Sequence, residues 1–165
     1  MESKGIGSTL KHFPGYGGST DTHWGMAWDN REISEFRERD LKPFQAGIEA
    51  GADSVMVSHN IVECMDADRP ASLSSAVHKL LREELGFRGV IMTDDLGMGA
   101  ISYFTKQKNP GVAAISAGND MIIYWDFDAT VDAVTEAVHA YKINISQVDN
   151  SVYRILMWKR ELGLI

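Results

Sequence analysis

Short apolar runs alternate with longer amphipathic segments along the chain. Four runs rich in β-branched and other apolar residues, each closed by glycine or polar residues, are typical of buried β-strands. They span residues 7–13, 54–58, 89–93 and 121–125. The segments after them carry apolar residues three or four positions apart, which predicts amphipathic helices. The predicted helices span residues 32–50, 74–86, 111–117, 130–141 and 146–162.

This alternation predicts an α/β fold with a parallel sheet, because parallel neighbours need a crossover that a helix normally supplies. Such a sheet either stays open and doubly wound or forms part of a (β/α)8 barrel, the TIM barrel. No glycine fingerprint of the dinucleotide-binding type opens the first helix, which favours the barrel. Four βα units make half of such a barrel, and we expect one domain over residues 1–165.

Composition narrows the class of protein. The 165 residues are 44% hydrophobic, which is enough for one domain with a buried core. The formal net charge is −7 and the cationic residues are scattered, so we expect no nucleic acid partner. No apolar run approaches the roughly 20 residues of a transmembrane helix, so no membrane span is predicted.

The expected location is the cytoplasm. Residues 1–5 lack the apolar core of a signal peptide. Cys64 is the single cysteine, which excludes an internal disulfide and fits a reducing compartment. A longer parent chain could carry a signal that this sequence does not contain.

Two carboxylates directly follow the third predicted strand. Because adjacent residues at a strand end point in opposite directions, we expect only one of Asp94 and Asp95 to face the barrel axis. Its neighbour then bonds to the backbone or caps the next helix. The inward carboxylate can act as a nucleophile. The alternative is that both carboxylates only cap a helix over residues 96–101.

A second candidate pair lies in a loop rich in glycine, serine and threonine. Asp21 and His23 are two residues apart, so both side chains can turn toward one point. A carboxylate bonded to one imidazole nitrogen fixes the tautomer and stabilises the imidazolium, which makes a proton donor near neutral pH. The alternative is an Asx turn with an exposed histidine.

Polar residues also end the first two predicted strands. Lys11 and His12 end the first, and Ser58 and His59 end the second. Polar groups at the ends of neighbouring strands converge at one edge of the sheet, which strengthens the prediction of a site there. Taken alone, His59 is better interpreted as a satisfied histidine at the edge of the core.

The remaining histidines and the tryptophans have simpler interpretations. His78 and His139 lie inside predicted helices, and we expect both at the surface. Four tryptophans are large enough to stack on a sugar ring: Trp24, Trp28, Trp125 and Trp158. Trp158 lies on an apolar helical stripe and is predicted to be a core residue.

Several motifs in the chain resemble those of glycoside hydrolase family 3, and are most similar to its bacterial β-N-acetylhexosaminidase branch. The resemblance covers residues 7–164, and its motifs occur in the family's order. The matching segments are residues 11–15 (Lys-His-Phe-Pro-Gly), 21–23, 40–44, 56–59, 70–74, 81–90 and 93–98.

The resemblance implies a TIM-barrel hydrolase that removes terminal β-linked N-acetylglucosamine with net retention. It implies that Asp94 is the nucleophile and that Asp21 and His23 form the acid/base pair. It implies no metal ion and no organic cofactor. Expected substrates are N-acetylglucosaminides such as peptidoglycan or chitin fragments.

Four residues are assigned to substrate binding under this resemblance. Lys11 and His12, from the Lys-His-Phe-Pro-Gly motif, are expected to contact the sugar. The site assignment further includes His59 and Met98 as substrate-binding residues.

The chain departs from the family pattern in two places. Tyr16 and residues 17–19 stand where the family usually has a second histidine followed by an acidic residue. The first four strands of the barrel, which supply an arginine to the sugar, are also absent. We therefore interpret the chain as the carboxyl-terminal half of the barrel. A half-barrel exposes two strand edges, which predicts self-association or pairing with an amino-terminal half. It also lacks half of the substrate pocket, so we expect weak or no activity for the isolated half.

Two other functions remain as alternatives. One is a metal-dependent TIM-barrel hydrolase, with ligands among His12, Asp21, His23, His59 and Asp94. It lacks the close histidine spacing that such metal sites favour. The other is a non-catalytic half-barrel that serves as an interaction module.

Overall fold

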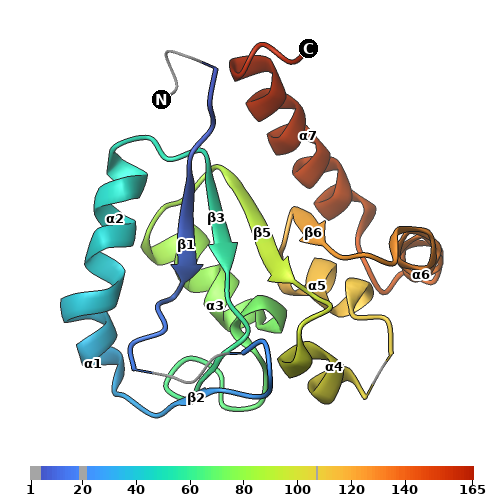
Figure 1. Ribbon diagram of the computed structural model, residues 1–165. Coiled ribbons are helices and arrows are strands. Elements are labelled where there is room, and N and C mark those ends of the chain that lie inside the picture. The colour runs from blue at the N-terminus through green and yellow to red at the C-terminus, as the bar shows by residue number, and fades with distance from the viewer. Residues whose placement is uncertain (1–4, 19–21, 107) are drawn as a thin grey trace.

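The computed structural model describes residues 5–18, 22–106 and 108–165. At its centre is a parallel sheet of four strands in the order β1-β3-β5-β6 (Figure 1). The strands are β1 (Thr9–Phe13), β3 (Ser54–Val57), β5 (Val90–Asp95) and β6 (Met121–Ile123). All four predicted strands are confirmed, and β1 and β6 are the edges of the sheet.

Helices connect the consecutive strands, as predicted. Between β1 and β3 the chain forms α1 (Ile33–Glu35), the π-helical turn η2 (Phe36–Asp40) and α2 (Leu41–Glu49). Between β3 and β5 it forms the short 3-10 turn η3 (Ala71–Leu73), α3 (Ser75–Lys79) and the π-helical turn η4 (Leu80–Glu84). The remaining helices are α4 (Gly99–Thr105), α5 (Gly111–Ala117), α6 (Phe127–His139) and α7 (Ile145–Glu161). Helix α4, considered from sequence only as a capped segment, is a full element.

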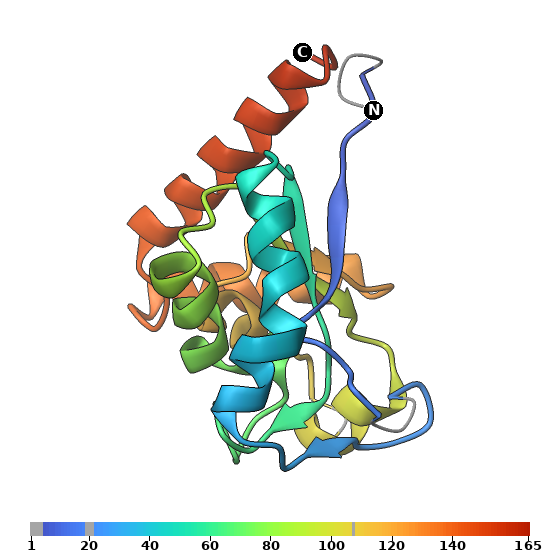
Figure 2. The ribbon, with the colours of Figure 1, turned by 90° about the vertical axis from the view of Figure 1, so that its left-hand side faces the viewer.

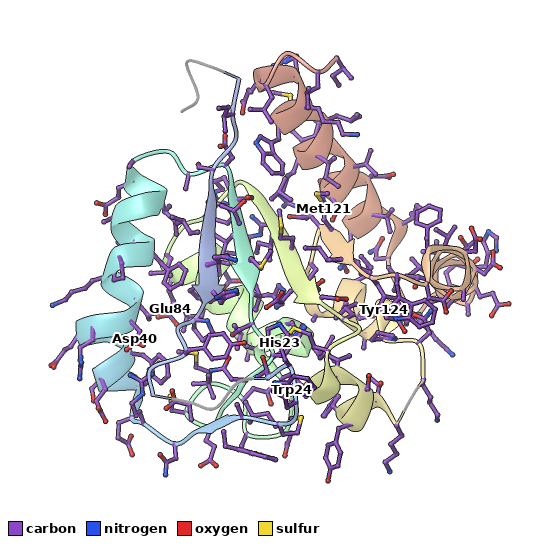
Figure 3. The ribbon with its side chains drawn as sticks, in the orientation of Figure 1. His23, Trp24, Asp40, Glu84, Met121 and Tyr124 are labelled. Atoms are coloured by element: carbon purple, nitrogen blue, oxygen red, sulfur yellow. The ribbon has the colours of Figure 1, made fainter. Side chains whose placement is uncertain are left out.

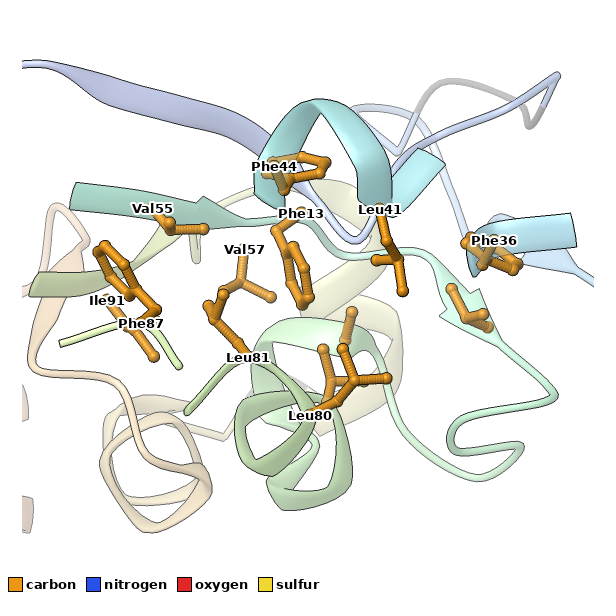
Figure 4. Packing of buried hydrophobic residues seen from close by; sticks show 13 residues of the cluster. Phe13, Phe36, Leu41, Phe44, Val55, Val57, Leu80, Leu81, Phe87 and Ile91 are labelled. Carbon is orange, nitrogen blue, oxygen red and sulfur yellow. The ribbon is translucent and has the colours of Figure 1, made fainter. Parts of the chain in front are cut away.

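The main hydrophobic core joins the sheet to the helices that connect its strands (Figures 2 and 4). Phe13 from β1 meets Phe44 from α2 edge-to-face, with the ring centroids 5.1 Å apart. Alternate residues of β3 and β5 point toward the same helices, as the strand period of two requires. The buried sheet and helix residues include Val55, Val57, Ile91, Leu41, Val77, Leu80 and Leu81.

A second, small parallel sheet was not predicted. It pairs β2 (Trp28–Asp29) with β4 (Ile61–Val62). Strands of two residues are too short to show an apolar period in the sequence. This sheet ties the long loop after β1 to the loop after β3, below the carboxyl ends of the main strands in Figure 1.

Two predictions about single residues need correction. His78 was expected at the surface, but it is only 3% exposed, and its Nδ1–H donates to the carbonyl oxygen of Ser74 at 2.7 Å. Its side of α3 faces α5, where a Cβ on Gly118 would lie 3.2 Å from the His78 Cβ. Trp158 was expected in the core but is only partly buried, with its indole against Gly7. His139 is exposed as predicted.

Within the described ranges, the helices are all too short or too polar to cross a bilayer.

Candidate active site

The carboxyl ends of β1, β3 and β5 lie at one rim of the sheet, at the lower end of the strands in Figure 1. Two predicted site residues meet there. The Nε2 atom of His12, from β1, lies 3.7 Å from the Oδ2 atom of Asp94, from β5. Both side chains are partly exposed, at 31% and 19%. A substrate at this rim can therefore reach both groups.

Asp94 and Asp95 divide their roles as the strand geometry predicts. The Oδ1 atom of Asp94 accepts the backbone N–H of Asp95 at 2.9 Å, which leaves Oδ2 on the side of His12. Asp95 is exposed, and its Oδ1 atom accepts the backbone N–H of Gly97 at 2.8 Å. Asp94 therefore faces the other rim residues, while Asp95 holds the turn that follows β5.

Burial lowers the pKa of His12, and the charge of Asp94 opposes that shift. Lys11 and His23 lower the pKa further through their positive charges. His12 is thus favoured in its neutral form near pH 7. The imidazole of His12 also packs against the ring of Tyr16. The two rings form a T-shaped pair with centroids 5.5 Å apart.

His23 lies in the loop between β1 and β2, close enough to His12 to act on its charge. The backbone of this loop docks on the start of α4. The N–H of Gly99 donates to the carbonyl of His23 at 3.2 Å, and the N–H of Ala100 donates to the carbonyl of Thr22 at 3.3 Å. His23 and Trp24, which are labelled in Figure 3, border an open pocket of about 510 Å³ at the end of β5.

The other predicted site residues have different surroundings. Lys11 is exposed on β1, so it is available to a ligand at the rim. Met98 lines the same pocket as His23, although its side chain is only 7% exposed. Asp21 lies outside the described residues.

His59 lies inside the protein and contacts the backbone of the rim at Asp95. It has no exposed surface, its Nε2 atom lies 2.9 Å from the carbonyl oxygen of Asp95, and its Nδ1 atom lies 2.7 Å from the Ser72 hydroxyl. Because a carbonyl only accepts, Nε2 carries the proton; burial lowers the pKa of His59 and favours this neutral form. Its ring positions the turn after Asp94, and both ring nitrogens are already bonded within the protein.

Sequence reasoning missed the polar network that supports the loop after β1. Arg31 binds two carboxylates at once, with Nη2 2.7 Å from Asp29 and Nη1 2.8 Å from Asp40. A Cβ on Gly15 would lie 2.6 Å from Asp40, and one on Gly17 would lie 2.5 Å from Arg31. Because both glycines lack a side chain and have positive φ, the loop backbone can contact Arg31 and Asp40 directly. The glycines were visible in the sequence, but their distant partners were not.

A second polar cluster lies on the helical side of the sheet, away from the rim. The side chain of Asp120 is 1% exposed and binds Arg82 at 2.5 Å and Arg154 at 2.9 Å. It borders a pocket of about 620 Å³ between α3, α5 and α7. Asp120 also accepts the backbone N–H of Ile91 at 2.9 Å, so the cluster joins β5, η4 and α7.

The metal-dependent alternative requires a cluster of metal-ligating side chains. Across residues 5–18, 22–106 and 108–165, no three histidine, cysteine, aspartate or glutamate side chains are grouped as metal ligands. One proposed ligand of that alternative, Asp21, falls outside these ranges.

The chain is of the α/β class, with helices connecting four parallel strands in sequential order. A carboxylate and two histidines lie at the carboxyl rim, where (β/α)8 barrels carry their active sites. Residues 1–158 match the glycosyl hydrolase family 3 N-terminal domain. The chain therefore belongs to glycoside hydrolase family 3.

Two curated relatives have names that agree with this family assignment. A β-hexosaminidase from Stenotrophomonas maltophilia (strain K279a) is 43% identical over 142 residues, which are 85% of this chain and 41% of that protein. A β-hexosaminidase from Xanthomonas campestris pv. campestris (strain B100) is 47% identical over 102 residues, covering 61% of this chain and 30% of that protein. The chain thus spans less than half the length of these curated relatives.

A solved structure shows the same fold. It is a glycoside hydrolase family 3 β-N-acetylglucosaminidase from Paenibacillus sp. str. FPU-7, with a TM-score of 0.92 and 34% identity over 98% of this chain and 32% of that one. The predicted α/β fold of four βα units from a TIM barrel is therefore confirmed.

Proposed function

We propose that this chain carries the nucleophile and the acid/base group of a retaining β-N-acetylhexosaminidase, which removes terminal β-linked N-acetylglucosamine. The observation that supports this most directly is the approach of His12 to Asp94 at the carboxyl rim, with His23 acting on the same histidine. A retaining glycosidase needs a carboxylate below the anomeric carbon and a proton donor above the leaving oxygen.

Asp94 attacks the anomeric carbon through Oδ2, and the bond from that carbon to the leaving oxygen breaks. His23 gives its proton to the departing oxygen, so the aglycone leaves as an alcohol. In the second step His23 takes a proton from water, the water oxygen bonds to the anomeric carbon, and Asp94 departs as a carboxylate. Asp21 raises the basicity of His23 in this proposal.

Lys11 and His12 bind the sugar in this scheme. Lys11 is exposed at the rim and donates to sugar hydroxyls, and neutral His12 lies beside the nucleophile oxygen. A neutral imidazole can accept from one hydroxyl and donate to another. Met98 lines the neighbouring pocket. The buried His59 contributes by holding the carbonyl of Asp95.

The substrate class follows the names of the relatives, which are β-hexosaminidases and a β-N-acetylglucosaminidase. We propose N-acetylglucosaminides, as peptidoglycan or chitin fragments, and a cytoplasmic location. Because β1 and β6 are open sheet edges, we also propose that the chain self-associates or pairs with an amino-terminal half-barrel. Turnover by the isolated chain is then weak or absent.

Covalent trapping tests the function without requiring turnover. The protein is incubated with a fluorinated N-acetylglucosaminyl donor bearing a good leaving group, alone and together with an amino-terminal half-barrel from a relative. We expect the mass of one glycosyl group to be added, and peptide mapping to place it on Asp94. Asp94→Asn should abolish the label.

Asp95→Asn is the matched control, because Asp95 is adjacent but bonds to Gly97. It should retain the label. A label that persists in Asp94→Asn would refute the assigned nucleophile. No label in either mixture would favour the non-catalytic half-barrel.

A further inference from the structure

Tyr16 stands at one of the two places where the chain departs from the family pattern. The glycines on either side of it are held against the body of the protein. The side-chain amide of Asn60 donates to the carbonyl oxygen of Gly15 at 3.2 Å, and a Cβ on Gly17 would lie 2.5 Å from Arg31. Asn60 has no exposed surface, so the first of these contacts is buried. Tyr16 therefore belongs to a firmly held part of the loop after β1.

The hydroxyl of Tyr16 contacts the segment that carries the proposed acid/base group. Its Oη atom lies 2.6 Å from the Oγ1 atom of Thr22, which has no exposed surface and directly precedes His23. The carbonyl oxygen of Thr22 accepts the backbone N–H of Ala100 at 3.3 Å. The residue before His23 is thus held twice, by its side chain on Tyr16 and by its backbone on α4.

The ring of Tyr16 contacts the opposite side of the site. It meets the imidazole of His12 at an interplanar angle of 87°, with the centroids 5.5 Å apart. The turn between the two residues supports this pair, because the N–H of Gly15 donates to the carbonyl of His12 at 2.9 Å. His12 in turn lies 3.7 Å from Asp94, the proposed nucleophile. Such edge-to-face ring pairs are favourable beyond the area that they bury.

We propose that Tyr16 is a positioning residue, whose hydroxyl holds His23 in place through Thr22 and whose ring holds His12 beside Asp94. The inference rests on the proposed function for the chemical roles of His23 and Asp94. It adds that one side chain joins the nucleophile side of the site to the acid/base side. Tyr16 acts on the reaction through these two neighbours.

The two contacts of Tyr16 affect different chemical steps. A donor with a good leaving group needs little protonation, so its transfer to Asp94 depends on the bound sugar and the carboxylate. Loss of the glycosyl group to water needs His23, because the water gives up a proton as its oxygen bonds to the anomeric carbon. Azide is already an anion, so it bonds to the same carbon without a base. In both cases Asp94 departs as a carboxylate.

Tyr16→Phe removes the hydroxyl and keeps the ring. The variant is labelled with the fluorinated donor in the mixture with an amino-terminal half-barrel, excess donor is removed, and loss of the label is followed by intact mass. We expect labelling at the wild-type rate. Loss to water should be slower by about threefold to tenfold, the range of one hydrogen bond. Loss to added azide should be unchanged.

Thr22→Val removes the other member of the hydrogen bond. It should slow the loss to water as much as Tyr16→Phe does, and the double variant should be no slower than either single variant, because both remove one interaction. Tyr141→Phe is the matched control, since Tyr141 is 95% exposed. It should leave labelling and both routes of label loss unchanged.

Tyr16→Leu removes the ring together with the hydroxyl. We expect it to slow the loss to water as Tyr16→Phe does. It should also slow labelling by about twofold to tenfold, because His12 loses the ring that packs against it beside Asp94. Labelling at the wild-type rate in Tyr16→Leu would overturn the role of the ring.

Amide hydrogen exchange of the chain alone tests the positioning of His23 without turnover. The N–H of Gly99 donates to the carbonyl of His23, and the N–H of Ala100 donates to that of Thr22. Both amides should exchange about threefold to tenfold faster in Tyr16→Phe and in Thr22→Val, because the segment that carries the acceptors is less firmly held. They should exchange at the wild-type rate in Tyr141→Phe.

The outcomes separate this proposal from the proposed function. Labelling of Asp94, with wild-type loss to water in Tyr16→Phe, would overturn the positioning of His23 and leave the function standing. Equal slowing of the loss to water and to azide would also overturn it, because the whole site would then be disturbed. A complete absence of labelling would count against the function. Exchange at Gly99 and Ala100 then decides, and wild-type rates in Tyr16→Phe would overturn the positioning role.

Discussion

His12 on the edge strand β1 and Asp94 on β5 approach to 3.7 Å, although β3 lies between their strands. Their side chains meet over the end of β3. The chain that leaves β3 is fixed from both sides: Ser58 donates its N–H to Phe13 of β1 at 2.9 Å, and His59 bonds the carbonyl of Asp95. The contact between two distant strands therefore depends on buried hydrogen bonds made by the strand between them.

The pKa of His12 should lie below its ordinary value of 6.5, because burial is the largest influence on it. Asp94→Asn removes the negative charge that raises this pKa, so the pKa should fall further. NMR titration of the His12 Hε1 signal measures both values. Asp95→Asn is the control and should change the midpoint little. A midpoint that stays constant in Asp94→Asn would show that the two side chains do not interact in solution.

Strand periodicity predicted that only one of Asp94 and Asp95 would face the rim, and the family resemblance selected Asp94. A buried apolar strand followed by two carboxylates allows only one of them to face the rim, and Asp94 does so while Asp95 bonds to Gly97. The same reasoning could not describe His59. Its partners Ser72 and Asp95 lie 13 and 36 residues away, and nothing in the local pattern reveals such bonds.

Fold predictions succeeded where a pattern was long enough to be periodic. The buried strands and α7, with 17 residues, met that condition. The two-residue strands β2 and β4 did not. His78 was misplaced because the helical period gives the direction of a side chain but not which other helix covers it. Here α5 covers that face at Gly118.

Stability should fall as the solution becomes acidic. Burial lowers the pKa of both His59 and His78 from 6.5, so the unfolded chain binds more protons than the folded one below that pH. The free energy of unfolding should decrease by roughly 1.4 kcal/mol per pH unit for each histidine that must stay neutral. Urea unfolding from about pH 5 to about pH 8 measures this change of the free energy of unfolding with pH.

His78→Asn should flatten that slope, because an amide cannot titrate. It can still donate to the carbonyl of Ser74, the acceptor of the His78 Nδ1–H. His139→Asn is the control, since His139 is exposed on α6 and should leave the slope unchanged. A slope that is the same in the wild type and in His78→Asn would contradict this account.

Asp120 should be among the most sensitive positions for stability. Its carboxylate accepts from the Ile91 N–H at 2.9 Å and the Ser151 hydroxyl at 2.8 Å, in addition to binding Arg82 and Arg154. Asp120→Ala leaves these donors without their acceptor and should cost about 3–5 kcal/mol. Chemical denaturation measures the loss.

An exposed ion pair provides the comparison. Arg37 and Glu84 lie 2.8 Å apart, but their side chains are 57% and 55% exposed. Arg37→Ala should therefore cost less than about 1 kcal/mol. Comparable losses for Asp120→Ala and Arg37→Ala would mean that the buried cluster does not join the helices to the sheet as described.

Open sheet edges should drive self-association. Ile123 is 40% exposed on the edge strand β6, and a charged side chain there opposes strand pairing. Sedimentation velocity at micromolar concentration should show association, and Ile123→Lys should shift the protein toward the monomer. Ile145→Lys, at a residue 56% exposed at the start of α7, should not. A monodisperse wild-type monomer would contradict the proposal.

The position of His23 should depend on Gly99. A Cβ at Gly99 would lie 2.7 Å from the carbonyl oxygen of His23, and because that atom belongs to the backbone, the whole loop must move. Gly99→Ala should destabilise the protein by about 1–3 kcal/mol. It should also slow the hydrolytic loss of the glycosyl label from Asp94, because His23, the proposed base for the attacking water, moves away. Gly18→Ala is the matched control, since a Cβ there meets nothing within 4 Å. Equal rates of label loss in the two variants would show that the contact between α4 and this loop does not position His23.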